Sequence, residues 1–229
     1  MAEGDGLLNR CRGFLAPTEG SNPSLSAIHI KFMANKQDIN FLYEIGSLKN
    51  VERGWRQHLA MECATVPEHT MRVVWLALLI ARGENKQIDE NKLIKMALVH
   101  DLAETRVSDL SYVQKVYATG KEDEAAHDLF ENTSLMDFED VLKEYESRES
   151  LEAKIVKDAD NLDVDLEMKE LEERGSKLPA KWLKFREQIK NEKLYTETGK
   201  QIWDQIQEMD PADWHLNSNK WVKIPEAGR

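Results

Sequence analysis

The stretch TVPEHTMRVVWLALLIARG (residues 65–83) decides the fold. It opens with Thr65, and Glu68 follows three residues later, which is the capping-box pattern that begins a helix. Apolar residues then occupy almost every position as far as Gly83, and glycine commonly ends a helix. We expect a central helix over about 67–82, buried on nearly all sides. Its apolar residues are Met71, Val73, Val74, Trp75, Leu76, Leu78, Leu79 and Ile80.

Helical periodicity continues on both sides of this stretch. Before it, one apolar stripe at helical spacing contains Phe41, Leu42, Ile45 and Leu48. No run alternates between apolar and polar residues for long enough to indicate a strand. The predicted fold class is all-α, with a single helical bundle over residues 33–209. We expect the further helices at about 90–103, 108–118, 122–131, 136–147, 150–174, 179–191 and 197–209.

Composition narrows the possible partners. The chain has 229 residues, enough for one sizeable domain with a buried core. It carries 31 Lys and Arg against 42 Asp and Glu, a formal net charge of -11. An acidic surface disfavours binding to nucleic acid or to anionic lipid, so we expect neither partner. An anionic small molecule is still possible, because it needs only a local basic pocket or a metal ion.

Cysteine content and hydropathy indicate the compartment. Cys11 and Cys63 are far apart and cannot form a disulfide framework, which favours a reducing cytoplasm. The most apolar run, MRVVWLALLIA (71–81), is too short to cross a bilayer and contains Arg72. No segment has the pattern of a secretory signal. We therefore expect a cytoplasmic protein without a membrane segment.

The two ends differ in character from the middle. Residues 1–32 are rich in Gly, Pro, Ser and Asn, without a sustained period, so we expect disorder there. Met33 is a plausible natural start, and residues 20–23 (GSNP) are what the tRNA-like sequence GGTTCGAATCCC would encode. The leader is therefore either disordered or spurious. Residues 210–229 are polar but contain Trp214 and Trp221, so we expect this tail to pack on the domain.

Three polar residues mark a candidate metal site. His69 is in the first turn of the central helix, and the pair His100-Asp101 lies near the end of the next one. If these helices pack antiparallel, the start of one and the end of the other come together. A fourth ligand could come from KIVKDADNLDVD (154–165), where Asp160 sits among apolar residues. Two imidazoles and two carboxylates suit Mn, Fe, Co, Ni or Zn.

These residues carry a resemblance. The order His69, His100-Asp101, Asp160 resembles the H…HD…D signature of the HD-domain metal-dependent phosphohydrolases. The flanking sequences resemble the 5′-deoxynucleotidase branch of that superfamily (HD domain-containing protein 2 type), over roughly residues 38–175. An HD dipeptide alone is a weak signal, but four ligands in order with matching flanks are specific. The matching stretches are SLKNVERGW, VPEHTMRVV, ALVHDLAETRVSDL and EYESRESLEAKIVKDADNLD.

The resemblance implies catalytic roles beside the ligands. Glu104 matches the catalytic acid of the family, and Asp109 matches the second acid of the same loop. Spacing supports Glu104 independently, because it follows Asp101 by three residues and His100 by four, one helical turn further on. Glu104 could orient the attacking water or protonate the leaving alkoxide. Asp109 could instead cap the helix expected after it.

The resemblance also implies a substrate pocket. Arg53 and Trp55 match the residues that hold the phosphate and contact the deoxyribose. The chain departs from its relatives here, because these have Arg-Trp or Arg-Thr-Gly-Trp where it has Arg53-Gly54-Trp55. Arg56 is therefore a rival for the phosphate role. Trp55 could also be only an apolar anchor for the first helix.

The metal count follows from what lies between the ligands. Relatives with two metal ions have additional histidines between the HD pair and the last Asp, and this chain offers only His127 there. We expect one divalent metal ion. Two non-functional interpretations remain open. The acidic neighbours of Asp160 could form a solvated helix face, and Lys157 could be their solvated partner.

The predicted function is hydrolysis of a nucleoside 5′-monophosphate, preferentially a 2′-deoxyribonucleotide, giving the nucleoside and phosphate. One alternative is another phosphate ester, such as a nucleoside triphosphate or an alarmone. Longer phosphate chains need more basic residues near the pocket than the sequence obviously supplies. A second alternative is a non-catalytic helical interaction module, which would predict a broken ligand set. The relatives tend to form dimers, so we expect a homodimer.

Overall fold

The all-α prediction is confirmed. The structure is a computed structural model that describes residues 33–118 and 121–216, in which no strand occurs and Glu52 and Thr65 form one isolated β-bridge. The chain divides into two units, residues 1–33 and 34–229, and the fold described below belongs to the second. The leader, residues 1–32, lies outside the described residues.

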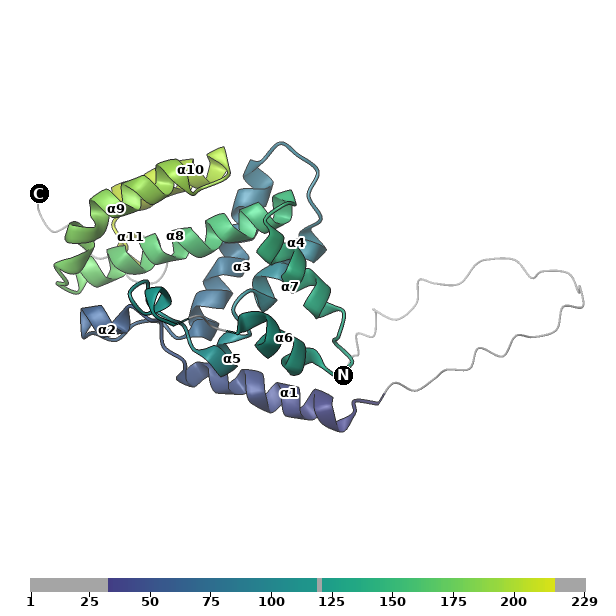
Figure 1. The fold of residues 1–229 in the computed structure, drawn as a ribbon. Coiled ribbons are helices and arrows are strands. Elements are labelled where there is room, and N and C mark those ends of the chain that lie inside the picture. Colours follow the sequence, from purple (N-terminus) through teal and green to yellow (C-terminus); the bar gives the residue numbers. More distant parts are fainter. Residues whose placement is uncertain (1–32, 119–120, 217–229) are drawn as a thin grey trace, which may run out of the picture. The chain divides into compact units, whose positions relative to one another are not determined.

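The described part of the chain contains eleven α-helices and two short 3-10 helices (Figure 1). They are α1 (Lys36–Gly46), η1 (Ser47–Asn50), α2 (Arg56–Leu59), α3 (Val66–Gly83), α4 (Glu90–Val99), α5 (Glu104–Val107), η2 (Gln114–Val116), α6 (Glu122–Phe130), α7 (Phe138–Ser147), α8 (Leu151–Glu173), α9 (Leu178–Glu192), α10 (Glu197–Glu208) and α11 (Asp213–Leu216). Two expectations were wrong. The helix over 90–103 ends at Val99, and 108–118 holds only the short η2.

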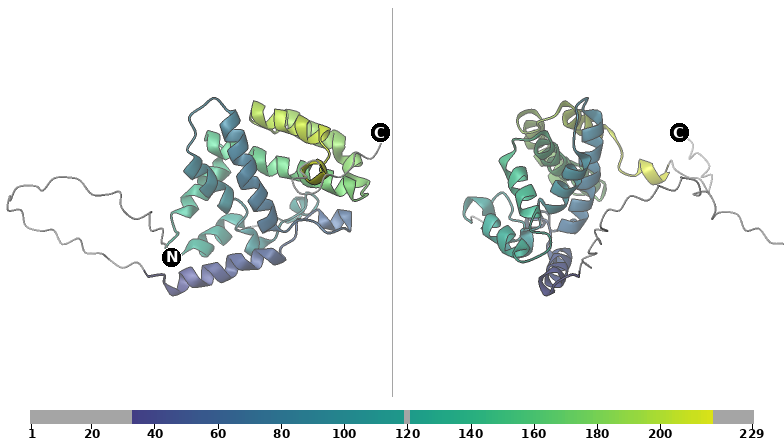
Figure 2. Two further views of the ribbon diagram at one scale, coloured as in Figure 1. Left: turned by 180° about the vertical axis from the view of Figure 1, so that it is seen from behind. Right: turned by 90° about the vertical axis from the view of Figure 1, so that its right-hand side faces the viewer.

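The core lies where α3, α4, α7 and α8 meet. Helix α3 packs against both α4 and α8, and α7 packs on the same two helices. Helices α9 and α10 cover α8, and Figures 1 and 2 show them along one side of it. Most of the largest fully buried side chains come from these packed helices, among them Ile80, Leu93, Met96, Ile155 and Leu162, and Phe130 of α6 joins the same core.

The central helix begins as the sequence predicts. The backbone N–H and the hydroxyl of Thr65 both donate to the Glu68 carboxylate, at 2.7 and 2.8 Å. These two bonds pair polar groups at the helix start and fix the direction in which the chain enters α3. Because His69 is only one residue further on, the cap also sets where that imidazole leaves the helix.

The expectation that α3 is buried on nearly all sides was wrong for one stripe. Met71, Trp75 and Leu79 are 64%, 62% and 62% exposed, whereas Val73 and Ile80 are fully buried. The exposed three recur every four residues and therefore lie on one face of the helix. Helices α4 and α8 pack against α3, and Met71 and Trp75 line an open pocket beside α8.

The tail is only partly described. Trp214, expected to pack on the domain, is 76% exposed on the one-turn helix α11, so the expectation was wrong for this residue. No residue of α11 is buried, and the described ring contact of Trp214 is with the neighbouring His215. Trp221 lies outside the described residues. None of the described helices combines the length and the apolar character of a transmembrane span.

Candidate active site

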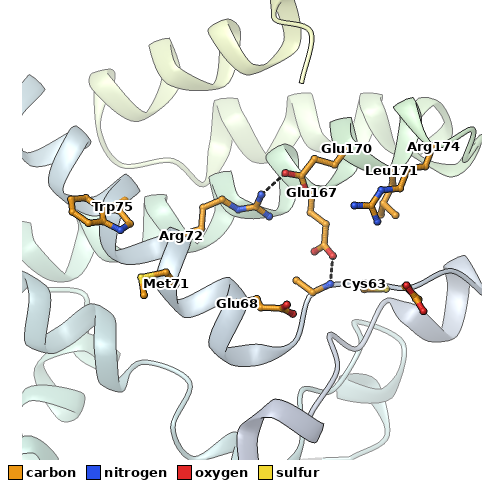
Figure 3. Close-up of a pocket in the computed structure, with 11 residues that line it drawn as sticks. Cys63, Glu68, Met71, Arg72, Trp75, Glu167, Glu170, Leu171 and Arg174 are labelled. Atoms are coloured by element: carbon orange, nitrogen blue, oxygen red, sulfur yellow. Dashed lines mark hydrogen bonds and ion pairs between the residues drawn. The ribbon is translucent and has the colours of Figure 1, made fainter. Parts of the chain in front are cut away.

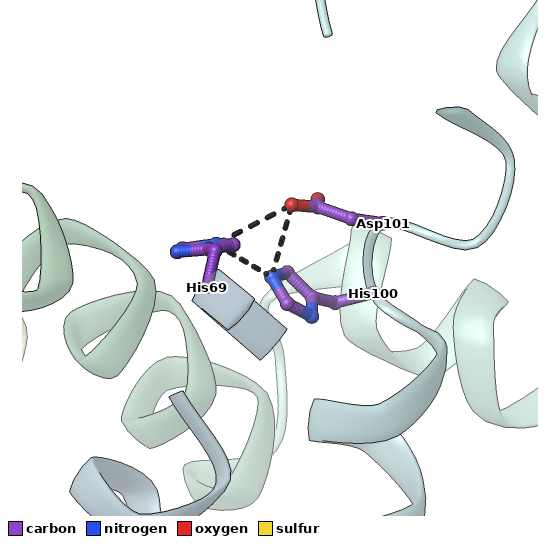
Figure 4. Close-up of side chains that lie close together, drawn as sticks. All are labelled: His69, His100 and Asp101. Carbon is purple, nitrogen blue, oxygen red and sulfur yellow. Dashed lines mark hydrogen bonds and ion pairs between the residues drawn. The ribbon is translucent and has the colours of Figure 1, made fainter. Parts of the chain in front are cut away.

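Three of the predicted metal ligands, His69, His100 and Asp101, have ligand atoms within 4.8 Å of one another, and the fourth, Asp160, contacts His69. His69 is in the first turn of α3, His100 caps the end of α4, and Asp160 lies on α8. The Nε2 atoms of the two histidines are 3.2 Å apart, and Asp101 Oδ2 is 3.4 and 3.2 Å from them (Figure 4). Asp160 Oδ1 is 3.3 Å from His69 Nε2. We call these four residues the ligand cluster.

Hydrogen bonds to the far sides of the imidazoles fix their protons. His69 Nδ1 is 2.6 Å from Asp163 Oδ2, and His100 Nδ1 is 2.8 Å from the carbonyl oxygen of Ala97. Because both partners accept hydrogen bonds, a neutral ring carries its proton on Nδ1 and presents the Nε2 lone pair to the cluster. Two lone pairs and two carboxylates then face one another, which is repulsive unless a cation lies between them.

A divalent cation fits the ligand cluster. Metal–ligand bonds of about 2.1 Å place neighbouring ligand atoms about 3.0 to 3.4 Å apart, which matches the distances between these side chains. Although burial and Arg53 oppose protonation, hydrogen bonds to Asp101, Asp160 and Asp163 hold the pKa of His69 well above its ordinary value. In the metal-free protein a proton can thus supply the missing positive charge.

A row of charged side chains behind His69 holds the imidazole. Asp163, which is fully buried, accepts from His69 Nδ1 and also pairs with Arg72 Nε. Arg72 Nη1 donates to Glu170 Oε1 at 2.7 Å, as Figure 3 shows. We call Asp163, Arg72 and Glu170 the supporting row. Such contacts orient a metal-binding histidine and raise its basicity.

Sequence reasoning missed the supporting row, although a signal was present. Asp163 follows Asp160 by three residues, so both carboxylates lie on the same side of α8. They contact opposite nitrogens of one imidazole, Oδ1 of Asp160 lying near Nε2 and Oδ2 of Asp163 near Nδ1 of His69. Arg72 likewise follows His69 by three residues on α3.

The acidic residues of α8 do not form a solvated face. Asp158 accepts from the backbone of Tyr195 and Thr196 at 2.8 Å each, and it holds the start of α10. Asp165 accepts from Arg186 Nε at 2.9 Å. Both aspartates are buried, as Asp163 is. Each acid therefore has its own structural partner, which leaves Asp160 as the one facing the cluster.

Lys157 is a close partner of Asp160. Its Nζ lies 2.7 Å from Asp160 Oδ2. Although burial opposes ionisation, the charge of Lys157 and the hydrogen bond from His69 hold the pKa of Asp160 well below its usual range. Asp160 is thus kept as a carboxylate, the form that binds a metal ion. Lys157 is thus the partner of an acid, as one of the sequence alternatives had it, with a side chain that is 36% exposed.

Arg53 enters the same site. This side chain is 6% exposed, and its guanidinium lies 3.2 Å from Asp101 Oδ2, 3.3 Å from Asp109 Oδ2 and 4.0 Å from Asp160 Oδ1. It therefore faces the cavity side of the ligand cluster. Asp109 also accepts from the backbone N–H of Gly54 at 3.0 Å. It caps no helix, since Val113 is the N-cap of η2.

The departure Arg53-Gly54-Trp55 has a structural reason. A Cβ added to Gly54 would lie 2.6 Å from Ser111 N and 2.7 Å from Asp109 O. Only glycine lets the segment after Arg53 approach the 109–111 loop this closely. The close approach brings Asp109 onto the Arg53 side chain, so the glycine shapes the site without contacting the ligands.

Of the two residues that follow Gly54, Trp55 packs at the site and Arg56 lies on the surface. Arg56 is exposed and pairs with Glu52 on the surface. The indole of Trp55 packs under Arg53, whose guanidinium carbon is 4.6 Å from the ring centroid. Trp55 Nε1 is buried without a hydrogen-bond partner among the described residues. The structure thus brings Arg53 and Trp55 to the site and leaves Arg56 outside it.

Glu104 lies at the mouth of the ligand cluster. It is the first residue of α5 rather than part of α4, because the chain makes a turn at residues 101–103. Its Oε2 is buried without a partner among the described residues. Burial, together with the charges of Asp101 and Asp109, raises the pKa of Glu104 to about 10 in the metal-free protein. The carboxyl is free to contact a bound molecule.

A polar cavity of about 240 Å³ adjoins the ligand cluster. His100, Asp101, Glu104 and Asp160 contribute to its wall. The expectation that few basic residues surround the pocket was wrong, since four cations line it: Arg53, Lys115, Arg148 and Lys157. They come from segments far apart in the sequence, which explains why no basic cluster is visible there. The cavity suits an anion bound beside a metal ion.

Comparisons with known proteins agree with this geometry. Residues 45–209 match the HD domain family. The 5′-deoxynucleotidase HDDC2 of Danio rerio is 32% identical over 146 residues, which covers 61% of this chain and 72% of the relative. The protein of the same name from Dictyostelium discoideum is 31% identical over 155 residues and is covered over 82% of its length, against 62% of this chain.

A solved structure has a similar fold. A conserved hypothetical protein from Pyrococcus furiosus is 26% identical, with a TM-score of 0.65, and the match covers 75% of this chain and 99% of that one. The family match spans most of the described domain and contains all four residues of the ligand cluster. The chain therefore belongs to the HD-domain family, in the 5′-deoxynucleotidase branch that its sequence resembles.

Proposed function

We propose that this protein is a metal-dependent 5′-deoxynucleotidase, which hydrolyses the phosphomonoester of 2′-deoxyribonucleoside 5′-monophosphates. The observation that carries the proposal is the convergence of the ligand cluster with Arg53 on one polar cavity. The names of the relatives from Danio rerio and Dictyostelium discoideum support the substrate class. We further propose that His69, His100, Asp101 and Asp160 hold one divalent ion (Mn, Co, Fe, Ni or Zn).

Each residue of the site has a distinct task in this reaction. A divalent ion bound there would neutralise phosphate charge and increase the acidity of the attacking water. Arg53 binds the phosphate through its planar guanidinium, which can contact two oxygens at once. Glu104 either orients the water as a base or protonates the leaving 5′-oxygen. Asp109 fixes Arg53 and the backbone at Gly54, so it positions the phosphate-binding group.

Two further properties are part of the proposal. We place the protein in the cytoplasm, because two widely separated cysteines suit a reducing compartment. We also propose a homodimer, following the tendency of the relatives. Sedimentation of the purified protein would test this state, and a monomer at micromolar concentration would contradict it.

A substrate panel tests the proposed activity. Purified protein is depleted of metal, reloaded with Mn, Co, Fe, Ni or Zn in turn, and assayed for phosphate release. The substrates are 5′-dNMPs, 5′-NMPs, 3′-dNMPs and dNTPs. We expect metal-dependent release from 5′-dNMPs that disappears in Glu104→Ala. Activity only on dNTPs would mean that the substrate is a nucleoside triphosphate and not a monophosphate. Metal binding without any phosphate release would favour a non-catalytic module.

A further inference from the structure

A second cavity opens beside the polar one. It has a volume of about 470 Å³, the size range of small-molecule sites. Four residues line both cavities, namely Arg53, Lys115, Asp109 and Asp160. Arg53 and Asp160 lie at the ligand cluster, where the phosphate is proposed to bind. A molecule whose phosphate lies there can therefore extend directly into the second cavity.

The second cavity differs from the first in its chemistry. Its wall is mainly apolar and aromatic, with Trp55, Leu110, Tyr112, Val164, Trp182 and Phe185. Tyr112 and Trp182 approach edge to face, with ring centroids 6.3 Å apart and an interplanar angle of 79°. Tyr112 and Phe185 are 63% and 56% exposed although they line a cavity. Exposed aromatic faces around a cavity are surfaces on which a flat ring can stack.

Helix α9, which supplies two of these rings, is held in place by hydrogen bonds to α8. Trp182 and Phe185 are three residues apart on α9 and share one face of it. The next residue, Arg186, donates to Asp165 at 2.9 and 2.6 Å and to the carbonyl oxygen of Asn161 at 2.7 Å. These bonds tie α9 to α8, so the aromatic wall has a fixed distance from Asp160.

The same bonds limit how the cavity can recognise a ligand. Arg186 lines it, but its charge is already neutralised by the buried Asp165. The Trp55 Nε1–H remains as a buried donor without a partner among the described residues. Ser111, Lys115 and Asn161 also line the cavity, but its broadest surfaces are the aromatic rings. It can therefore hold a flat ring by stacking.

We propose that Trp182 and Phe185 of α9, with Tyr112, form the nucleobase subsite, and that it binds the base of the nucleotide by stacking. The inference rests on the proposed 5′-nucleotidase function and adds the residues that bind the part of the substrate remote from the phosphate. In this arrangement the sugar lies between the two cavities, beside Trp55. Binding at α9 should thus be separable from binding at the ligand cluster.

The test uses variants of the metal-loaded, full-length enzyme. Trp182→Leu keeps apolar bulk but removes the aromatic face, Trp182→Phe restores a ring, and Phe185→Ala truncates an exposed side chain that is less needed for folding. Leu183→Ala, on the same helix but outside this cavity, is the matched control. The substrates are the four 5′-dNMPs and 2-deoxyribose 5-phosphate, which carries the same phosphoester but lacks a base.

We expect Trp182→Leu and Phe185→Ala to raise KM for every dNMP at least about fivefold, the loss of one stacked ring. Trp182→Phe should lie close to wild type. Hydrolysis of 2-deoxyribose 5-phosphate and inhibition by inorganic phosphate should change less than twofold. Titration calorimetry with 2′-deoxyadenosine should show the same loss of affinity without any catalytic step, and Leu183→Ala should match wild type throughout.

Two results separate the inference from the function on which it rests. If wild type releases no phosphate from any dNMP, the proposed function fails. If wild type is active and the α9 variants affect dNMPs and inorganic phosphate binding equally, or affect neither, the base does not bind at α9. A change confined to one base would overturn stacking as the mode of binding, because every base has a face that can stack.

Discussion

The two ring nitrogens of His69 face two different regions of the molecule. Nε2 faces the ligand cluster, which borders a cavity, whereas Nδ1 faces the supporting row. In the ligand cluster, two imidazole lone pairs and two carboxylates face one another beside a cavity, and the nearby cations Arg53 and Lys157 pair with the carboxylates. In the supporting row every charge has a partner, from Asp163 through Arg72 to Glu170. The difference teaches that one region is built to receive a cation and the other to hold the ring still.

Breaking the ligand cluster should have the largest effect. Asp101→Asn keeps the size of the side chain but removes its charge. We expect metal content to fall and kcat/KM for dNMPs to drop about a thousandfold or more, because a metal ion supplies several kcal/mol of transition-state stabilisation. Metal per chain, by mass spectrometry, and phosphate release are measured together. Asp140→Asn, an exposed position on α7, is the control. Full metal content with activity within tenfold of wild type would show that Asp101 is not a ligand.

Gly54→Ala should disturb the Arg53–Asp109 pair beside the cavity without changing any residue of the ligand cluster. The added methyl group must displace the 109–111 loop, since it would lie 2.6 Å from Ser111 N. A shift of about 1 Å at the Arg53–Asp109 pair can cost roughly a hundredfold in rate. We expect that loss in kcat/KM while metal content stays near wild type.

Gly46→Ala is the matched control for this substitution. A Cβ at Gly46 meets nothing within 4 Å, so activity should be unchanged. Circular dichroism at the assay temperature shows whether both variants are folded. Wild-type kinetics in folded Gly54→Ala would mean that the close approach to the 109–111 loop is not needed for phosphate binding.

The supporting row should matter less than the ligands. In Asp163→Asn the imidazole loses its anionic partner but keeps a hydrogen-bonding group, and such changes typically cost 10- to 100-fold in metal affinity or activity. We expect a weakened metal Kd in competition with a chelator, with smaller loss of kcat at saturating metal. Glu170→Gln, at the exposed end of the row, should change Kd less than about threefold. Equal effects of the two variants would contradict a graded support of His69.

These two regions also differ in how far the sequence reveals them. The ligand cluster follows an ordered motif, in which His69 and His100-Asp101 lie at helix ends and Asp160 lies within a helix, so the four residues could be selected without coordinates. The supporting row has no such motif. Asp163 is one of four aspartates on α8, and only the packing of α3 on α8 shows which one contacts His69.

The remaining misses have similar causes. Lys115, Arg148 and Lys157 meet at one cavity although they are separated along the chain, so their combined charge depends on tertiary structure. Helix propensity alone favoured a helix over 108–118, but the segment is needed as a loop around Asp109 and Gly54. The exposure of Met71 and Trp75 also depends on which faces of α3 its neighbours cover.

We expect the smallest effect on activity from a substitution of Arg56. This prediction tests whether Arg53, and not Arg56, binds the phosphate. The two arginines are three residues apart, yet Arg53 is 6% exposed beside the ligand cluster and Arg56 is paired with Glu52 on the surface. An exposed ion pair is worth about 0 to 1 kcal/mol, and Arg56 lies outside both cavities. We expect Arg56→Ala to change kcat/KM less than about twofold.

Arg53→Lys provides the contrast. The lysine keeps a positive charge but cannot contact two phosphate oxygens in the planar geometry of arginine. We expect KM for dNMPs to rise about tenfold or more, since charge-assisted paired bonds are among the stronger hydrogen bonds. If Arg56→Ala proved the more damaging of the two, the phosphate would bind on the α2 side of the molecule. The cavity shared by Arg53 and the ligand cluster would then not be where the phosphoester is cleaved.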